Sequence, residues 1–168
     1  AMLGEAVARR YRRVQHDARD ASMLARVGRT SSGNDLAVNR AWVEADFRIA
    51  TGFIEPHFFA GYSGGPKAVL PGIAGESSIL YNHRASNIYH PRATWGVTDG
   101  KPVWEEMAEA ARLARTDFLV NVTLDAEKRV TGVFAGDPAS AHRAGCAHVR
   151  SFAMAAVDAP FDIVIASN

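Results

Sequence analysis

The sequence is poor in the features that mark secreted, membrane-spanning or nucleic-acid-binding proteins. It has one cysteine, so no disulfide can form within the chain, and the reducing cytoplasm is its expected location. No apolar run reaches the length of a membrane span, and the arginine-rich N-terminal region lacks the apolar core of a signal peptide. The formal net charge of +1 gives no general reason to expect nucleic acid or a membrane as a partner.

Length and composition fit one globular domain with its own core. Of the 168 residues, 48% are hydrophobic and 22% are charged, which is ordinary for a water-soluble fold. The run from Phe161 to Ala166 resembles a buried strand placed directly before the last residues. We therefore expect a piece of a longer protein, in which residues 161–168 begin the next strand or a second domain.

Hydrophobic patterning predicts alternating helices and strands. Helices are expected over residues 3–14, 37–45, 75–85, 102–114 and 137–152, and strands over residues 22–27, 47–51, 118–124, 129–135 and 161–166. The strands are short and rich in valine and isoleucine, which is typical of strands buried between layers. The two strands over 118–135 are expected to form a hairpin. The pattern predicts an α/β fold with a layered mixed, largely parallel sheet flanked by helices.

The chemistry-bearing residues gather in one polar, glycine-rich stretch. From Glu55 to Lys67 the sequence reads EPHFFAGYSGGPK. His57 follows a strand-like apolar run, and ligand-binding and catalytic groups of open α/β sheets gather at the carboxyl ends of strands. A histidine there can accept or donate a proton near neutral pH. His57 is therefore a candidate acid or base.

Lys67 and His83 extend this set. Lys67 stands among apolar residues, where partial desolvation lowers the pKa of an amine and makes it nucleophilic. His83 could bind a metal but lacks the second histidine, four residues away, of a zinc helix. The glycines could cradle a phosphate, although the spacing is not that of a P-loop. The residues alone leave open a three-residue site, a phosphate-binding domain, and unrelated surface side chains on a tight turn.

The same stretch closely resembles the nickel-dependent lactate racemase family. The resemblance rests on the run from Glu55 to Lys67, on Leu-Pro-Gly at 70–72, and on Asn-His at 82–83. It also covers Asn39-Arg40, Ala45-Asp46, Glu105-Glu106-Met107 and residues 133–138, and so extends over nearly the whole chain.

The resemblance implies that residues 1–168 are a partial N-terminal, cofactor-binding domain of a two-domain enzyme. The family racemises or epimerises a 2-hydroxy acid such as lactate and uses a nickel-pincer nucleotide, which dedicated biosynthesis proteins make. By resemblance, Lys67 holds this cofactor covalently through a thioamide, His83 is the fourth nickel ligand, and His57 is one of two acid/base histidines. The residues expected to line the cofactor are Tyr62, Ser63, Gly64 and Gly65.

In the implied reaction, a histidine removes the hydroxyl proton of the substrate while the α-hydrogen passes reversibly to the cofactor as hydride. The second acid/base histidine and the carboxylate-binding arginine of the family are expected upstream of Ala1, so the isolated fragment is expected to be inactive. Pro66 stands where some family members have arginine. The alternative hypothesis is a non-catalytic module that binds a nucleotide or a metal.

Overall fold

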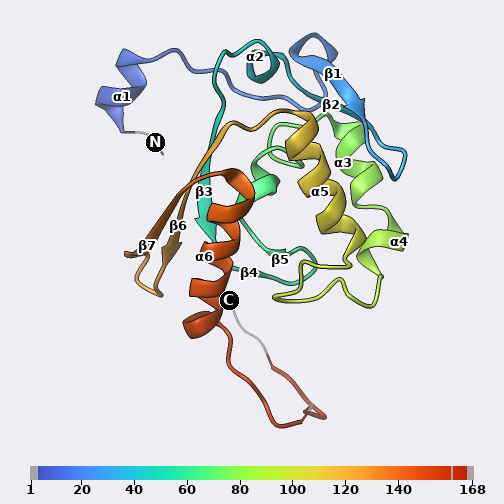
Figure 1. Cartoon of the computed structure of the whole chain (residues 1–168), viewed down its shortest axis with the longest axis vertical. Coiled ribbons are helices and arrows are strands. Elements are labelled where there is room, and N and C mark those ends of the chain that lie inside the picture. The colour runs from blue at the N-terminus through green and yellow to red at the C-terminus, as the bar shows by residue number, and fades with distance from the viewer. Residues whose placement is uncertain (1–3, 160, 166–168) are drawn as a thin grey trace.

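The computed structural model describes residues 4–159 and 161–165, which contain both helices and strands (Figure 1). The strands are β1 (Leu24–Arg29), β2 (Asp35–Asn39), β3 (Ile49–Ile54), β4 (Pro56–His57), β5 (Gly61–Tyr62), β6 (Phe118–Leu124) and β7 (Val130–Gly136). The helices are α1 (Glu5–Arg10), α2 (Arg40–Val43), α3 (Glu76–Asn82), α4 (Ala85–Ile88), α5 (Pro102–Leu113) and α6 (Pro138–Ala153), with the 3-10 helices η1 (Ala21–Met23) and η2 (Gly65–Ala68). None of these helices is long and apolar enough to cross a membrane.

The central sheet has the order β3-β6-β7. Strand β3 pairs with β6 in parallel, and β6 pairs with β7 as an antiparallel hairpin. Alternate residues of β6 are buried, among them Leu119, Asn121 and Thr123, because α6 packs against this face of the sheet (Figure 1). The mixed sheet flanked by helices that the sequence predicts is confirmed, and so is the hairpin.

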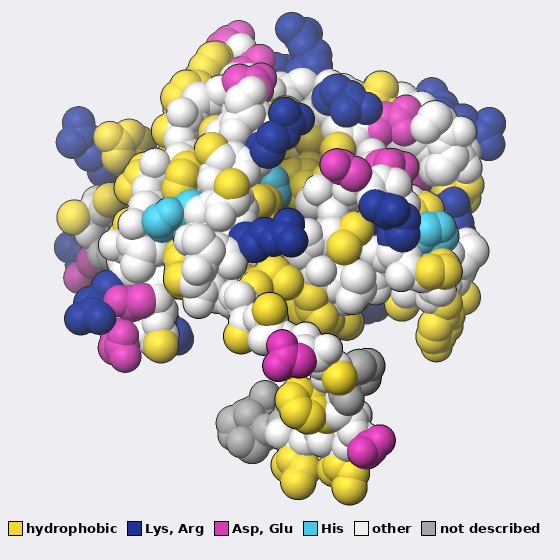
Figure 2. Space-filling model, turned by 60° about the horizontal axis from the view of Figure 1, so that its bottom comes forward, with side chains coloured by type: hydrophobic (Ala, Val, Ile, Leu, Met, Phe, Trp, Pro, Cys, Tyr) yellow, Lys and Arg dark blue, Asp and Glu magenta, His cyan; other side chains and the backbone are white. Residues whose placement is uncertain are grey.

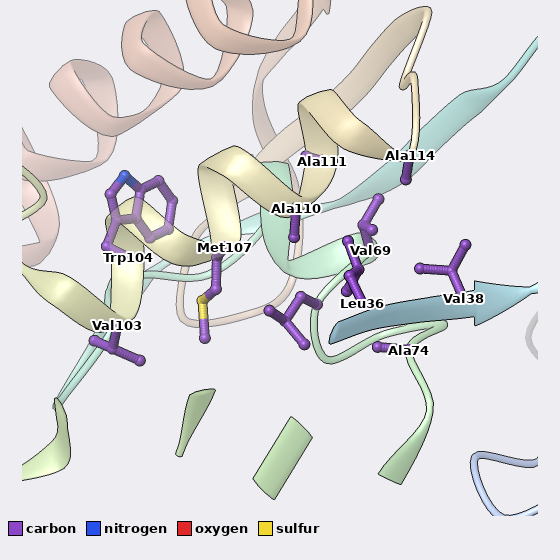
Figure 3. Packing of buried hydrophobic residues seen from close by; sticks show 11 residues of the cluster. Leu36, Val38, Val69, Ala74, Val103, Trp104, Met107, Ala110, Ala111 and Ala114 are labelled. Carbon is purple, nitrogen blue, oxygen red and sulfur yellow. The ribbon is translucent and has the colours of Figure 1, made fainter. Parts of the chain in front are cut away.

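The largest apolar core lies between α5 and the segments around β2 and η2. Figure 3 shows Val103, Met107 and Ala110 on one side of α5, facing Leu36 of β2 and Val69 after η2. All five side chains are fully buried. Each contributes on the order of 1–3 kcal/mol by leaving water, so this core fixes α5 against the loop that carries Lys67.

Two predicted elements are wrong. Residues 37–45 are not one helix, because Leu36 and Val38 alternate into the core as strand β2 and only then does the short α2 begin, capped by the Asn39 side chain. Residues 161–165 form no strand. Ile163, Val164 and Ile165 are 76–91% exposed and pair with no strand of the described chain. Ala166 and the residues after it lie outside the described part.

The described residues after α6 project from the body of the molecule and carry hydrophobic side chains at the outer tip of the projection (Figure 2). Apolar patterning predicted a strand there because it reports burial, but a strand also needs a hydrogen-bonding neighbour. The central sheet supplies none to this segment.

Candidate active site

The strand pair β4–β5 positions His57. Directly after β3 the chain turns back on itself, so that His57 pairs with Gly61 and Pro56 with Tyr62. The imidazole of His57 stacks on Phe58 with ring centroids 4.8 Å apart and meets the edge of Phe59 at 4.7 Å. His57 therefore lies at the carboxyl end of β3, as its sequence position predicted.

The surroundings of His57 favour its neutral form. Burial, together with smaller electrostatic contributions from Lys67, Lys101 and His83, lowers the pKa of His57 to about 4. The backbone N–H of Ala60 donates to Nδ1 of His57 at 3.2 Å. Because Nδ1 accepts, the neutral ring carries its proton on Nε2.

Lys67 lies on η2, at the end of the glycine loop. Its Nζ lies 5.9 Å from the centroid of the Phe59 ring. Burial lowers the pKa of Lys67, and the nearby carboxylate of Glu55 opposes this shift. The neutral amine, which is the nucleophilic form, is therefore more accessible than in a solvated lysine.

His83 caps the C-terminus of α3, and its ring centroid lies 5.3 Å from that of Phe59. Its Nδ1 donates to the carbonyl of Ile79 at 3.0 Å, which leaves a lone pair on Nε2. A buried network holds this helix end, because the side-chain amide of Asn82 donates to the carbonyl of Val103 and to Glu106 Oε2 at 2.7 Å. A histidine that binds a metal commonly donates its other ring N–H to a carbonyl in this way.

The aromatic ring of Phe59 is the point at which the three predicted residues meet. It contacts the rings of His57 and His83 and lies under the ammonium of Lys67. The sequence singled out the three polar residues. The motif spacing could not show that this ring is their shared neighbour.

The four residues expected to line the cofactor make structural contacts. Tyr62 is buried in an apolar cluster with Ile54 and Val149. The hydroxyl of Ser63 donates to the carbonyl of Phe53 and accepts the N–H of Glu55. Gly64 and Gly65 form the turn itself, with φ of +72° and +53°, in the left-handed region that favours glycine.

Two buried side chains from distant segments hold this turn. Asn121 Oδ1 of β6 accepts the N–H of Gly65 at 2.8 Å, and His142 Nε2 of α6 donates to the carbonyl of Ser63 at 2.9 Å. Burial raises the pKa of the Cys146 thiol to about 12, so it keeps its proton and donates to Nδ1 of His142 at 3.4 Å. The thiol is thus structural. Asn121 could have been noticed as the one amide in the strand sequence FLVNVTL, whereas His142 gave no signal.

A pocket of about 390 Å³ lies between α5 and α6 and reaches the underside of the glycine turn. Its lining includes Pro66, Trp104, Leu119 and His142, but not His57, Lys67 or His83. Large pockets often mark binding sites. His142 and Cys146, which also line this pocket, have shifted pKa values, but they hydrogen-bond to each other and to Ser63. The amine of Lys67 and the Nε2 lone pair of His83 lie instead around Phe59, which we therefore take as the candidate active site.

Comparison with known proteins identifies the family of this chain. The family model described as the lactate racemase N-terminal domain matches residues 1–96, more than half of the 168 residues. The chain belongs to the lactate racemase family. The family predicted from the motif is thereby confirmed.

Two curated lactate racemases match almost the whole chain. The protein from Thermoanaerobacterium thermosaccharolyticum is 43% identical over 169 residues, which cover 100% of this chain and 39% of the relative. The protein from Lactiplantibacillus plantarum is 41% identical over 166 residues, which cover 98% of this chain and 39% of the relative. The chain thus spans about two fifths of the length of these lactate racemases.

Solved structures agree with this placement. The lactate racemase apoprotein from Thermoanaerobacterium thermosaccharolyticum has a TM-score of 0.85 and 41% identity, covering 86% of this chain and 35% of that chain. A protein from Thermotoga maritima has a TM-score of 0.66 and 22% identity, covering 81% of this chain and 38% of that chain. The second likeness concerns the fold alone.

The described residues of this lactate racemase family member form no metal site of their own. Within residues 4–159 and 161–165, no group of three or more His, Cys, Asp and Glu side chains lies close enough together to hold a metal ion. His83 nevertheless offers one free imidazole nitrogen beside an amine of lowered pKa. A metal bound here needs most of its ligands from a group outside these side chains.

Proposed function

We propose that this chain is the cofactor-anchoring part of an enzyme that racemises or epimerises a 2-hydroxy acid, lactate or a close analogue, with a nickel-pincer nucleotide. The observation that carries the proposal is the meeting of His57, Lys67 and His83 at the Phe59 ring. Membership of the lactate racemase family supports the reaction class. Because the chain spans 39% of the relatives, the remaining active-site groups belong to regions outside it.

The donor set fits this cofactor. The amine of Lys67 is the attachment point, because its lowered pKa favours the nucleophilic form. Nε2 of His83 is the ligand that the chain offers to nickel, a metal for which imidazole is a suitable ligand. A site with a single protein ligand suits a metal that an organic group already holds on its other sides. When bound, the cofactor supplies the acceptor for the α-hydrogen of the substrate, which these side chains cannot provide.

His57 moves the hydroxyl proton of the substrate in this proposal. With Nδ1 accepting from Ala60, the neutral ring presents an N–H at Nε2 and donates a hydrogen bond to the substrate oxygen. His57 becomes a base at Nε2 once the bond to Ala60 breaks and the ring changes tautomer. Phe58 and Phe59 shield one side of the ring from water. The second acid/base histidine is proposed to come from outside this chain.

Partners and location follow from the same proposal. Loading of the cofactor requires its biosynthesis proteins. Both the loading and the single reduced thiol of Cys146 fit a cytoplasmic location. We propose that residues 1–168 are a partial N-terminal cofactor-binding domain, and the match of the lactate racemase N-terminal domain to residues 1–96 supports the N-terminal placement.

The test is a chimaera in which this chain replaces the aligned region of the Thermoanaerobacterium lactate racemase, produced together with the cofactor-biosynthesis proteins. We expect it to interconvert D- and L-lactate. The variant His57→Gln should lose turnover by at least about a hundredfold, as for an acid/base group, while retaining cofactor. His90→Gln is the matched control. If His57→Gln turned over lactate at the rate of His90→Gln, the acid/base role of His57 would be contradicted. If the unsubstituted chimaera bound the cofactor but did not turn over lactate, the result would favour a non-catalytic binding module.

A further inference from the structure

Lys101 is a buried cation that the sequence did not single out. It stands at the N-cap position of α5, and it is 0% exposed. Its Nζ donates to the carbonyl of Thr94 at 2.7 Å, and no carboxylate of the described chain pairs with it. A buried ammonium held by one carbonyl destabilises a fold. A lysine buried in this unfavourable way suggests a role other than packing.

Lys101 lies behind the strand pair that carries His57. Gly61 is the cross-strand partner of His57, and a Cβ on Gly61 would come within 3.1 Å of Lys101 Nζ. The carbonyl of Gly61 accepts the N–H of Gly96 at 3.0 Å. Lys101 therefore links the start of α5 to the loop of residues 94–97, and this loop hydrogen-bonds to β5 through Gly96.

We propose that Lys101 is a positioning residue for His57, because its ammonium fixes the loop of residues 94–97 beneath β4–β5 and holds a buried positive charge behind Gly61. The other titratable groups that act on His57 are Lys67 on η2 and His83 at the end of α3, while Glu55 acts on Lys67. These charges oppose protonation of His57.

The catalytic role of the Lys101 charge rests on the proposed function. Covalent attachment through Lys67 would remove the positive charge of that side chain. Lys101 would then be the lysine that continues to keep His57 neutral and able to exchange a proton with substrate. The placement of Lys101 itself depends only on the contacts of the unloaded chain.

The experiment is a pH titration of the His57 ring signals by NMR in the unloaded chain, which needs no cofactor and is independent of racemase activity. We expect the pKa of His57 to rise in Lys101→Met, to rise more in Lys67→Met, and to stay at its parent value in Lys101→Arg. Lys128→Met, which removes a lysine from the exposed β6–β7 turn, is the control. A folded Lys101→Met whose His57 titrates as in the parent would overturn the proposal, whatever its melting temperature.

A second measurement covers the case in which Lys101→Met does not fold. Burial lowers the pKa of Lys101 to about 8. In Lys67→Met, the ring signals of neutral His57 should therefore shift once more near pH 8, when Lys101 loses its proton. A flat His57 signal through this range would contradict the proposal.

Discussion

His142 on α6 donates its Nε2 proton to the carbonyl of Ser63, 79 residues earlier in the chain. The ring stacks on Trp104 with centroids 5.0 Å apart and accepts at Nδ1 from the Cys146 thiol. Burial lowers the pKa of His142, so the ring stays neutral and both of its nitrogens have a partner. The glycine turn that precedes Lys67 thus takes its shape from the helix beneath it.

Removal of this support should loosen the turn. We expect His142→Ala to lower the free energy of unfolding by about 2–4 kcal/mol, because it leaves a cavity and an unpaired carbonyl. Amide hydrogen exchange at residues 64–67 should become faster than in the parent. The control is His148→Ala, six residues further along α6, where the histidine packs on Phe134 and Phe152. Equal exchange at residues 64–67 in both variants would contradict the account.

The turn should also reject a side chain at Gly65. A Cβ there would come within 2.4 Å of His142 Cδ2, and φ is +53°. We expect Gly65→Ala to destabilise the chain by about 2–5 kcal/mol, from the left-handed backbone and from the clash together. Gly136→Ala also has a positive φ, of +138°, but nothing lies within 4 Å of the added Cβ. Chemical denaturation should therefore show a clearly smaller loss of unfolding free energy for Gly136→Ala. Equal losses in the two variants would show that the contact with His142 does not contribute.

The lowered pKa of His57 predicts how stability depends on pH. The folded-state pKa is about 4, against 6.5 for an unperturbed histidine, so the unfolded chain binds more protons between these values. Stability should therefore fall as the pH drops from about 7 toward 4. The measurement is thermal unfolding across this range. The dependence of stability on pH should be weaker in His57→Gln than in His90→Gln. The same dependence in both variants would show that folding does not shift the pKa of His57.

The sequence predicted best where local patterning and tertiary structure agree. Strand β6 matches its predicted limits, because alternate residues of Phe118–Leu124 enter the core, and the proline of α5 marks the start of that helix. It failed at β2, where burial of Leu36 and Val38 outweighed helical propensity. In both β6 and β2, burial of every second residue determined that the segment is a strand.

The sequence predicted the residues of the candidate site that belong to one motif, but not those that other elements bring to it. His57, Lys67 and His83 stand in one motif, so the sequence indicated them together. Lys101 and Asn121 reach the same loop from other elements, and their contacts arise only when the sheet and α5 assemble. A buried lysine or asparagine also looks like any polar residue in a sequence, because burial is a property of the fold.

The most direct test of the account is the intact mass and nickel content of this chain after production with the cofactor-biosynthesis proteins. We predict a covalent adduct that maps to Lys67, with about one nickel per adduct, as a single imidazole ligand at His83 would allow. Lys67→Ala should lose the adduct, and His83→Ala should keep the adduct but lose nickel. A parent chain with neither adduct nor nickel, or an adduct that survives in Lys67→Ala, would contradict the claim that these two residues hold the cofactor.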